Sequence, residues 1–161
     1  DDEVFEPADR FNVQMVGRLI EQQYVWRFQE QFCQLYSHSP SSRKLACRAV
    51  EIRAFLLEHG IWQDTDIYFN GKRFTTRDPE TKKYYYNDPE KLFVENNQNP
   101  RDYFEYVADD HILSMSFEGP VYHMINGYAL GGLVRRFNKI FEKYGVYYEQ
   151  GDAWNLTCYY A

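Results

Sequence analysis

The chain has only three cysteines and no Cys-x-x-Cys pair, which excludes the common structural zinc and dithiol redox motifs. Cys33, Cys47 and Cys158 are odd in number and widely spaced, which favours buried free thiols in a reducing compartment. No apolar run approaches the ~20 residues needed to cross a bilayer. We therefore predict a cytoplasmic protein without a membrane span. The chain begins at Asp1, and the sequence leaves open whether an N-terminal segment was removed.

The sequence also lacks the short motifs that bind nucleotides or activate nucleophiles. It has no Gly-x-Ser-x-Gly elbow, and Gly127, Gly131 and Gly132 do not fit dinucleotide or P-loop spacing. With 18 basic against 24 acidic residues, the net charge of −6 argues against a nucleic-acid binder. We therefore predict no cofactor, no metal ion and no nucleic-acid partner. The residues of one basic helix stripe keep phosphate contact open as an alternative: Arg135, Arg136, Lys139 and Lys143.

Aromatic residues, in contrast, are abundant. The 161 residues include 15 Tyr, 12 Phe and 3 Trp, which is 19% of the chain. Several tyrosines occur in runs, at 84–86, 147–148 and 159–160. Adjacent side chains of an extended segment point to opposite faces, so each run places at least one ring away from the core. Half-buried tyrosine is typical of binding surfaces and ligand clefts.

Apolar periodicity predicts two helices in the first part of the chain. The first, at about 9–36, is apolar on two sides, which favours deep burial or, alternatively, homo-oligomerisation through this helix. The second begins at Ser39-Pro40 and ends at His59-Gly60. Its basic residues are predicted to lie in water: Arg43, Lys44, Arg48 and Arg53.

The pattern then changes to strands. Asn70-Gly71 is a strong hairpin signal, and a second turn leads to a predicted third strand at 82–86. Residues 87–102 are predicted to form an irregular crossover, followed by a strand at 111–117. A third helix starts at Pro120 and ends at Gly145; its glycines either permit close packing on the sheet or split the helix by a kink near Gly131-Gly132. The segment 146–160 is predicted to form a terminal hairpin around a Gln-Gly-Asp turn.

This order of elements predicts an α+β fold. We expect an antiparallel sheet of about five or six strands, built from a meander and the C-terminal hairpin, with three main helices packed on one face. The second face then carries many of the paired tyrosines. A length of 161 residues fits one globular domain spanning 1–161, of which residues 1–6 are expected to fray.

Acidic residues concentrate between Asp88 and Glu118, where Lys91 and Arg101 are the only basic residues. One interpretation is a solvated loop region. The other is a docking surface for a basic partner, including the possibility of a nucleic-acid mimic. The eight acids of this stretch are Asp88, Glu90, Glu95, Asp102, Glu105, Asp109, Asp110 and Glu118.

Together, aromatic richness and this acidic stretch predict a small intracellular interaction or regulatory domain. It would bind an unidentified protein partner through an aromatic surface bordered by acidic residues, and it would not be an enzyme. The predicted aromatic anchors are Tyr84, Tyr86, Tyr103, Tyr147, Trp154 and Tyr159. The predicted acidic border is Asp102, Glu105, Asp109 and Asp110.

The alternative is a small-ligand binder or hydrolase with an aromatic-lined pocket. Its polar candidates are an Asp109-Asp110-His111 group and the pair Glu118 and His123. The two groups lie at opposite ends of one predicted strand, roughly 20 Å apart, and cannot share one site. Glu118 and His123 therefore form the candidate catalytic pair for acid–base or metal-assisted hydrolysis, while capping and exposed charge are the structural interpretation.

Overall fold

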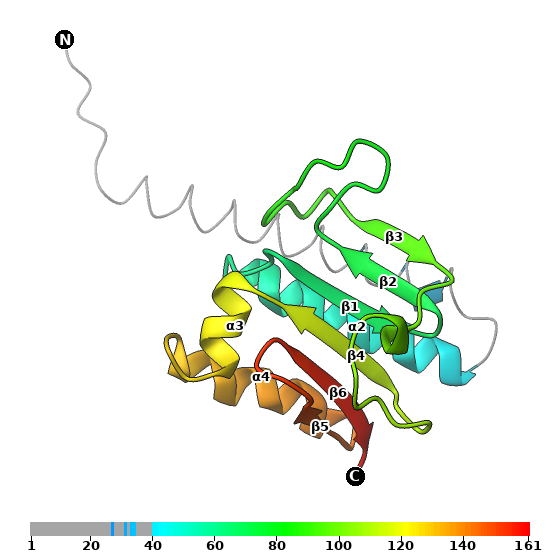
Figure 1. The fold of residues 1–161 in the computed structure, drawn as a ribbon, viewed down its shortest axis with the longest axis vertical. Helices are drawn as coiled ribbons and strands as arrows, with labels where there is room; N and C mark the ends of the chain where they lie inside the picture. Colours follow the sequence, from blue (N-terminus) through cyan, green and yellow to red (C-terminus); the bar gives the residue numbers. More distant parts are fainter. Residues whose placement is uncertain (1–26, 28–30, 32, 35–39) are drawn as a thin grey trace.

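The computed structural model describes Arg27, Gln31, Cys33 and Gln34, all of them helical, and residues 40–161, with side chains from Lys44 onward. The predicted first helix, and with it the hypothesis of oligomerisation, therefore lies largely outside the described residues. The predicted α+β architecture is confirmed. The sheet is six-stranded and antiparallel, in the order β3-β2-β1-β4-β6-β5. Helices α2 and α4 pack together against one face of it (Figure 1).

The strands are short and joined mainly by turns and loops. Their bounds are β1 Thr65–Phe69, β2 Lys72–Thr75, β3 Phe93–Asn96, β4 Leu113–Phe117, β5 Val146–Gln150 and β6 Asn155–Tyr160. The helices are α2 Pro40–Glu58, α3 Gly119–Ile125 and α4 Gly131–Lys143, with a 3-10 turn at Pro100–Asp102. The Asn70-Gly71 hairpin and the terminal hairpin both form as predicted.

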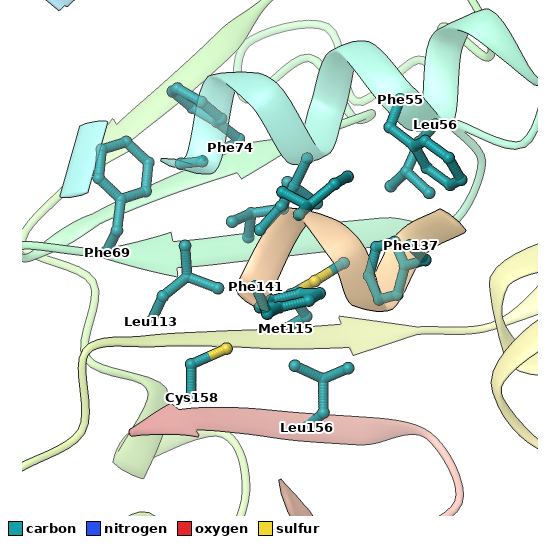
Figure 2. Packing of buried hydrophobic residues seen from close by; sticks show 14 of the residues in the cluster. Phe55, Leu56, Phe69, Phe74, Leu113, Met115, Phe137, Phe141, Leu156 and Cys158 are labelled. Atoms are coloured by element: carbon teal, nitrogen blue, oxygen red, sulfur yellow. The ribbon is translucent and has the colours of Figure 1, made fainter. Parts of the chain in front are cut away.

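The strand register gives the sheet one apolar and one polar face. Ile67 lies between Phe74 and Met115, and all three are buried against the helices. Figure 2 shows this core, where residues from α2 and α4 meet residues from β1, β2, β4 and β6. The next position along each strand belongs to the opposite face, here called the open face. One row across the open face is Glu95, Arg73, Tyr68, Ser114 and Thr157.

The predicted third strand at 82–86 is wrong. Lys82 and Asn87 have positive φ values of 61° and 53°, which interrupt an extended strand at both ends. Only an isolated bridge joins Arg77 to Tyr84. The third strand of the meander is instead β3, which lies inside the segment predicted to be an irregular crossover.

The predicted third helix is two helices. α3 ends at Ile125 and α4 begins at Gly131, with Gly127 at φ 76° and Leu130 at φ 59° between them. A positive φ is left-handed backbone, which stops a right-handed helix. The break therefore comes before the glycine pair at which a kink was predicted.

The prediction of three free thiols is also wrong. Cys33 and Cys47 form a disulfide with a Cα–Cα distance of 5.4 Å, while Cys158 is free and buried. The cysteines therefore do not support a cytoplasmic location. Among the described residues, no helix is long and apolar enough to span a membrane.

Two of the basic residues predicted to lie in water are buried. Arg48 is 6% exposed and Arg53 is 4% exposed, whereas Lys44 is exposed as predicted. The Arg53 Nη2 atom donates to the carbonyl oxygens of Asp88, Pro89 and Lys91, at 3.2, 3.4 and 2.9 Å. Burial lowers the pKa of Arg53 to about 10. Arg53 thus anchors the turn that leads into β3.

Replacing Arg53 with methionine is expected to lower the free energy of unfolding by about 2 kcal/mol, because three part-buried carbonyl acceptors lose their donor. Urea denaturation measures the loss, and hydrogen exchange of the amides of residues 87, 88 and 90–92 locates it. Lys44→Met on the same helix is the matched control and should change stability by less than about 0.5 kcal/mol. Equal stability of the two variants would rule out this anchoring role.

Candidate functional site

One end of the open face is covered by the loop that follows the 3-10 turn. Phe104 is 5% exposed and packs edge-on against Tyr68 and Trp154, with ring centroids 5.7 and 6.0 Å apart. Tyr103 lies beside it and contacts Tyr68 at 5.4 Å. The loop therefore closes this end of the sheet and leaves the other end accessible.

A cleft of about 360 Å³ lies at the accessible end. Its floor comes from β1, β2, β3 and β4, one wall from the loop after β2, and the other from the start of α3 and Trp154. This volume fits a small ligand or a few side chains of a partner. The lining residues with charged or aromatic side chains are Asp64, Asp66, Arg73, Arg77, Lys82, Tyr84, Glu95, Phe117, Glu118 and Trp154.

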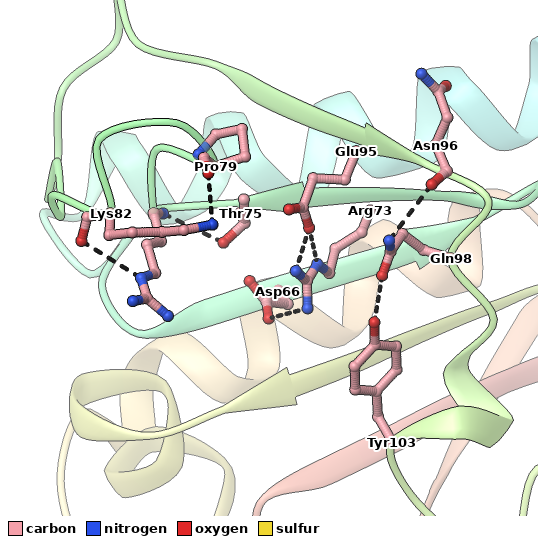
Figure 3. A network of polar contacts seen from close by, with 10 residues as sticks. Asp66, Arg73, Thr75, Pro79, Lys82, Glu95, Asn96, Gln98 and Tyr103 are labelled. Carbon is pink, nitrogen blue, oxygen red and sulfur yellow. Dashed lines mark hydrogen bonds and ion pairs between the residues drawn. The ribbon is translucent and has the colours of Figure 1, made fainter.

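Three charged side chains from three strands meet on the floor of the cleft (Figure 3). The Arg73 guanidinium donates to Glu95, with Nε–Oε2 at 2.6 Å, and its Nη1 lies 3.6 Å from the Asp66 carboxylate. The Arg73 side chain is 20% exposed, and those of Asp66 and Glu95 are 24% and 21% exposed. At this depth water screens the charges only partly, so each ion depends on its neighbours.

This environment shifts the proton affinities of the network. Burial raises the pKa of Asp66, although a hydrogen bond to Thr75 and the charge of Arg73 act in the opposite direction. Burial alone would lower the pKa of Arg73, but Tyr68, Asp66 and Glu95 more than compensate and raise it. Arg73 is therefore a permanent cation, while Asp66 is poised to take up a proton more readily than an exposed aspartate.

Two tyrosines hold Arg73 in place. Its guanidinium lies 5.9 Å from the Tyr68 ring centroid and 5.3 Å from that of Tyr103. The Tyr103 hydroxyl in turn donates to Gln98, which follows β3 (Figure 3). Cation–π contact of this kind restrains a guanidinium without neutralising it. Arg73 on the floor of the cleft is thus held both by ion pairs and by ring contacts.

The walls of the cleft are aromatic and remain exposed. Tyr84 is 54% exposed and Trp154 is 41% exposed. Tyr86 lies next to Tyr84, at a centroid distance of 5.6 Å, and its hydroxyl donates to Asp64 Oδ1 at 2.5 Å. This hydrogen bond, with the negative charge of Asp64, raises the pKa of Tyr86 to about 12. Tyr86 thereby fixes one carboxylate at the rim.

The two other cations of the cleft point back to their own turn. Arg77 Nε donates to the Lys82 carbonyl at 3.3 Å, and the Arg77 guanidinium lies 5.5 Å from the Tyr84 ring centroid. Lys82 Nζ donates to the Pro79 carbonyl at 2.5 Å. The Glu118 carboxylate, in contrast, makes no hydrogen bond or ion pair within the part of the chain that the structure describes. Glu118 is therefore available to a ligand.

The structure divides the predicted aromatic anchors among several places. Tyr84 and Trp154 line the cleft, Tyr86 lies at its rim, and Tyr103 stacks on Arg73. Tyr147 lies on the outermost strand β5, 45% exposed. Its cross-strand neighbour Tyr159 is only 8% exposed, and the Tyr159 hydroxyl accepts from the Ala108 amide at 3.4 Å. Tyr159 is therefore a structural residue of the open face and not an accessible anchor.

The predicted acidic border lies in the loop that covers the sheet and not in the cleft. All four of its residues are exposed, and Asp109 pairs with Arg101 at 2.5 Å. The loop reaches the cleft through Phe104, which packs on Trp154. Asp109 and Asp110 precede β4, whose opposite end contributes Ser116 and Phe117 to the cleft. None of the four acids lines the cleft. They are Asp102, Glu105, Asp109 and Asp110.

The two residues of the candidate catalytic pair, Glu118 and His123, lie in different surroundings. Glu118 is the N-cap residue of α3 and lines the cleft. His123 is exposed in the last turn of α3, where its ring contacts those of Tyr122 and Tyr128 at 5.7 and 6.1 Å. No hydrogen bond or ion pair joins Glu118 to His123. Across the described residues, no cluster of three His, Cys, Asp or Glu side chains is arranged to bind a metal ion.

Sequence reasoning missed the charged floor of the cleft. Asp66 and Tyr68 alternate with the buried Ile67 and Phe69 along β1, so strand parity alone places them on the open face. The signal was present in the sequence, but only the register shows that Arg73 and Glu95 align with them.

Comparisons with protein-family models, curated proteins and solved structures found no match.

Proposed function

We propose that this protein is an interaction domain that binds a basic segment of a protein partner in the cleft. The observation that supports this most directly is the exposed Glu118 carboxylate in a cleft whose walls also carry the exposed rings of Tyr84 and Trp154. Tyrosine and tryptophan side chains are typical of binding hot spots.

The charges of the cleft favour a cationic group over an anionic one. The carboxylates of the cleft, Asp64, Asp66, Glu95 and Glu118, outnumber its cations, Arg73, Arg77 and Lys82, by one. Arg73 is matched by Asp66 and Glu95. Arg77 and Lys82 donate to carbonyl groups of their own turn, which leaves their charges in place on the wall after β2. Two carboxylates then remain on the opposite wall, Asp64 and Glu118. The net charge of −6 gives the protein as a whole the same sign.

A peptide-display selection tests the proposal. Random peptides are selected on the immobilised protein at physiological salt, and the best sequence is then titrated by calorimetry. We expect enrichment of lysine and arginine, and about tenfold or greater weakening by Trp154→Ala and by Glu118→Gln. Tyr147→Ala is the matched control, because Tyr147 is similarly exposed but lies outside the cleft.

Two results would reject this function. Selection of acidic or uncharged peptides would contradict the charge argument. Loss of binding in Tyr147→Ala, with normal binding by Trp154→Ala and Glu118→Gln, would move the site away from the cleft. Melting temperatures of all three variants show whether a lost interaction reflects an unfolded protein instead.

A second candidate function is small-ligand binding or acid–base hydrolysis in the same cleft. The observation in its favour is Asp66, a half-buried carboxyl whose pKa is raised by burial and which faces the cleft. Such a group is suited to donate or accept a proton. Turnover of a hydrolysable small molecule that is lost in Asp66→Asn, with a pH profile that follows Asp66, would favour this function over partner binding.

A further inference from the structure

The connection between α3 and α4 ends in three exposed apolar residues, Tyr128, Ala129 and Leu130, here called the apolar tip. Tyr128 is 70% exposed and Leu130 is 43% exposed, and Ala129 between them is exposed as well. Figure 1 shows this connection at the left margin of the molecule. A Cβ added at the flanking Gly127 or Gly131 would meet no atom within 4 Å. The apolar tip therefore projects into open solvent.

Hydrogen bonds and a ring contact hold the apolar tip in this position. The Tyr128 amide donates to the His123 carbonyl at 2.9 Å, and the Tyr128 ring stacks on the Tyr122 ring with centroids 5.9 Å apart and 17° between the ring planes. Asn126 Nδ2 donates to the Ala153 carbonyl at 2.6 Å, which fastens the connection to the turn before β6. The exposure of the tip is thus built into the fold, and exposed apolar surface of this kind is typical of an interaction site.

The chain around the apolar tip is basic. Residues 119–141 contain no acidic residue, although the whole chain has a net charge of −6. Of the basic stripe on α4, Arg136 pairs with Glu58 at 3.4 Å. Arg135 and Lys139 are exposed and make no hydrogen bond or ion pair with the side chains that the structure describes. They lie one helical turn apart on the same side of α4, here called the basic face.

The order of these groups along α4 matches the layers of a bilayer surface. Leu130 is the N-cap residue of α4, and Arg135 and Lys139 follow it by about 8 and 14 Å along the helix axis. Interfacial segments bury their apolar side chains about 5–10 Å deep, at the boundary of headgroups and acyl chains. With the tip at this depth, the basic face lies among the lipid headgroups. Tyrosine is enriched at this boundary because it joins an apolar ring to a polar hydroxyl.

Other classes of partner fit this surface less well. Nucleic-acid bases stack on open aromatic faces, but one face of the Tyr128 ring is covered by Tyr122, and Ala129 and Leu130 carry no ring. A protein partner needs a hollow that is complementary in shape to a projecting tip. A fluid bilayer adapts to the tip without such a hollow.

We propose that the apolar tip and the basic face dock this protein on the surface of a membrane that contains anionic lipids. The tip enters the boundary between headgroups and acyl chains, and Arg135 and Lys139 bind the negatively charged headgroups. This inference does not rest on the proposed partner-binding function, because no residue of the apolar tip or the basic face lines the cleft.

Sedimentation with lipid vesicles at physiological salt tests the charge requirement. The protein should bind phosphatidylcholine vesicles that contain about 30% phosphatidylserine at least tenfold more tightly than vesicles of phosphatidylcholine alone. Arg135→Gln and Lys139→Gln should each weaken binding about fivefold, since each removes one cation from the membrane surface. Lys83→Gln is the matched control, because Lys83 is exposed but lies outside this surface.

A substitution in the apolar tip tests insertion. Leu130 has a φ of 59°, which asparagine tolerates, so Leu130→Asn should keep the wild-type melting temperature and bind vesicles about tenfold more weakly. Tyr147→Ala, which removes an exposed ring of β5, should bind vesicles as wild type does. Tyr128→Trp provides a positive signal, because its fluorescence should be quenched by brominated acyl chains more strongly than that of wild type.

Several results would overturn the proposal. These are no binding to anionic vesicles, equal binding to both vesicle compositions, normal binding by folded Leu130→Asn, or no added quenching in Tyr128→Trp. Binding of single-stranded RNA or an acidic peptide in place of vesicles, lost in Arg135→Gln, would assign the surface to another partner and reject membrane docking. Glu118→Gln should bind vesicles normally and Leu130→Asn should bind a cleft-selected peptide normally, so failure of one proposal is distinguishable from failure of the other.

Discussion

Replacing Arg73 with methionine is expected to lower the free energy of unfolding by about 3 kcal/mol at neutral pH. The variant leaves Asp66 and Glu95 facing each other on the floor of the cleft without the cation that joins them. Removing one partner of a largely desolvated ion pair is costly, because the remaining charges lose their attraction but keep their desolvation. Methionine keeps an apolar side chain of similar length, but it removes the guanidinium that lies over the Tyr68 and Tyr103 rings.

The loss should depend on pH in a defined direction. The pKa of Asp66 is already raised in the folded protein, and removing Arg73 raises it further. A carboxyl whose pKa is higher in the folded state stabilises the fold fully below its unfolded pKa of ~3.9. That stability is lost as pH rises through the folded pKa. The deficit of Arg73→Met should therefore be large at about pH 7 and smaller at about pH 4.

Urea denaturation of wild type and variant at the two pH values measures this effect. Arg77→Met is the matched control, since Arg77 is an exposed arginine of the same cleft and pairs with no carboxylate among the described residues. The triple variant Asp66→Asn, Arg73→Met, Glu95→Gln should recover most of the loss. A pH-independent deficit, or none at all, would show that the three charges do not act as a network.

The parts of the fold that the sequence predicted are those encoded by local signals. Asn70-Gly71 requires left-handed backbone and gave the β1–β2 hairpin, and Pro40 and Gly60 delimit α2. β3 was missed because it has only four residues, Phe93–Asn96, too few to establish a period of two. Its pairing with β2 across a loop of 17 residues is a tertiary event.

The exposed rings of the candidate site could be predicted from the sequence, but its charged floor could not. Exposed rings such as Tyr84 and Trp154 follow from composition and runs, because so many tyrosines cannot all fit inside. The Asp66–Arg73–Glu95 network needs the register of three strands, which single-sequence patterns do not supply. The assignment of Arg48 to solvent failed because helix periodicity cannot show that two tyrosines from distant elements cover it.

Replacing Phe137 with alanine is expected to destabilise the protein by about 4 kcal/mol, within the range for emptying a buried aromatic position. Phe137 is fully buried on α4, with ring centroids 4.9 Å from Phe141, 5.7 Å from Phe55 and 6.2 Å from Tyr148. These contacts join α2, α4 and β5, so the cavity left by the ring cannot close by moving one element alone. Chemical denaturation measures the change.

Because Phe137 and the cleft lie on opposite faces of the sheet, the effect of this variant on stability can be measured separately from its effect on binding. Phe137 packs on the helical side, whereas the cleft lies on the open face, so folded Phe137→Ala should bind a cleft-selected peptide as wild type does at low temperature. Arg135→Ala, an exposed position of the same helix, should change stability by less than about 0.5 kcal/mol. Weakened binding by folded Phe137→Ala would mean that the core and the cleft are coupled through strands such as β1, β2 and β4, which contribute side chains to both.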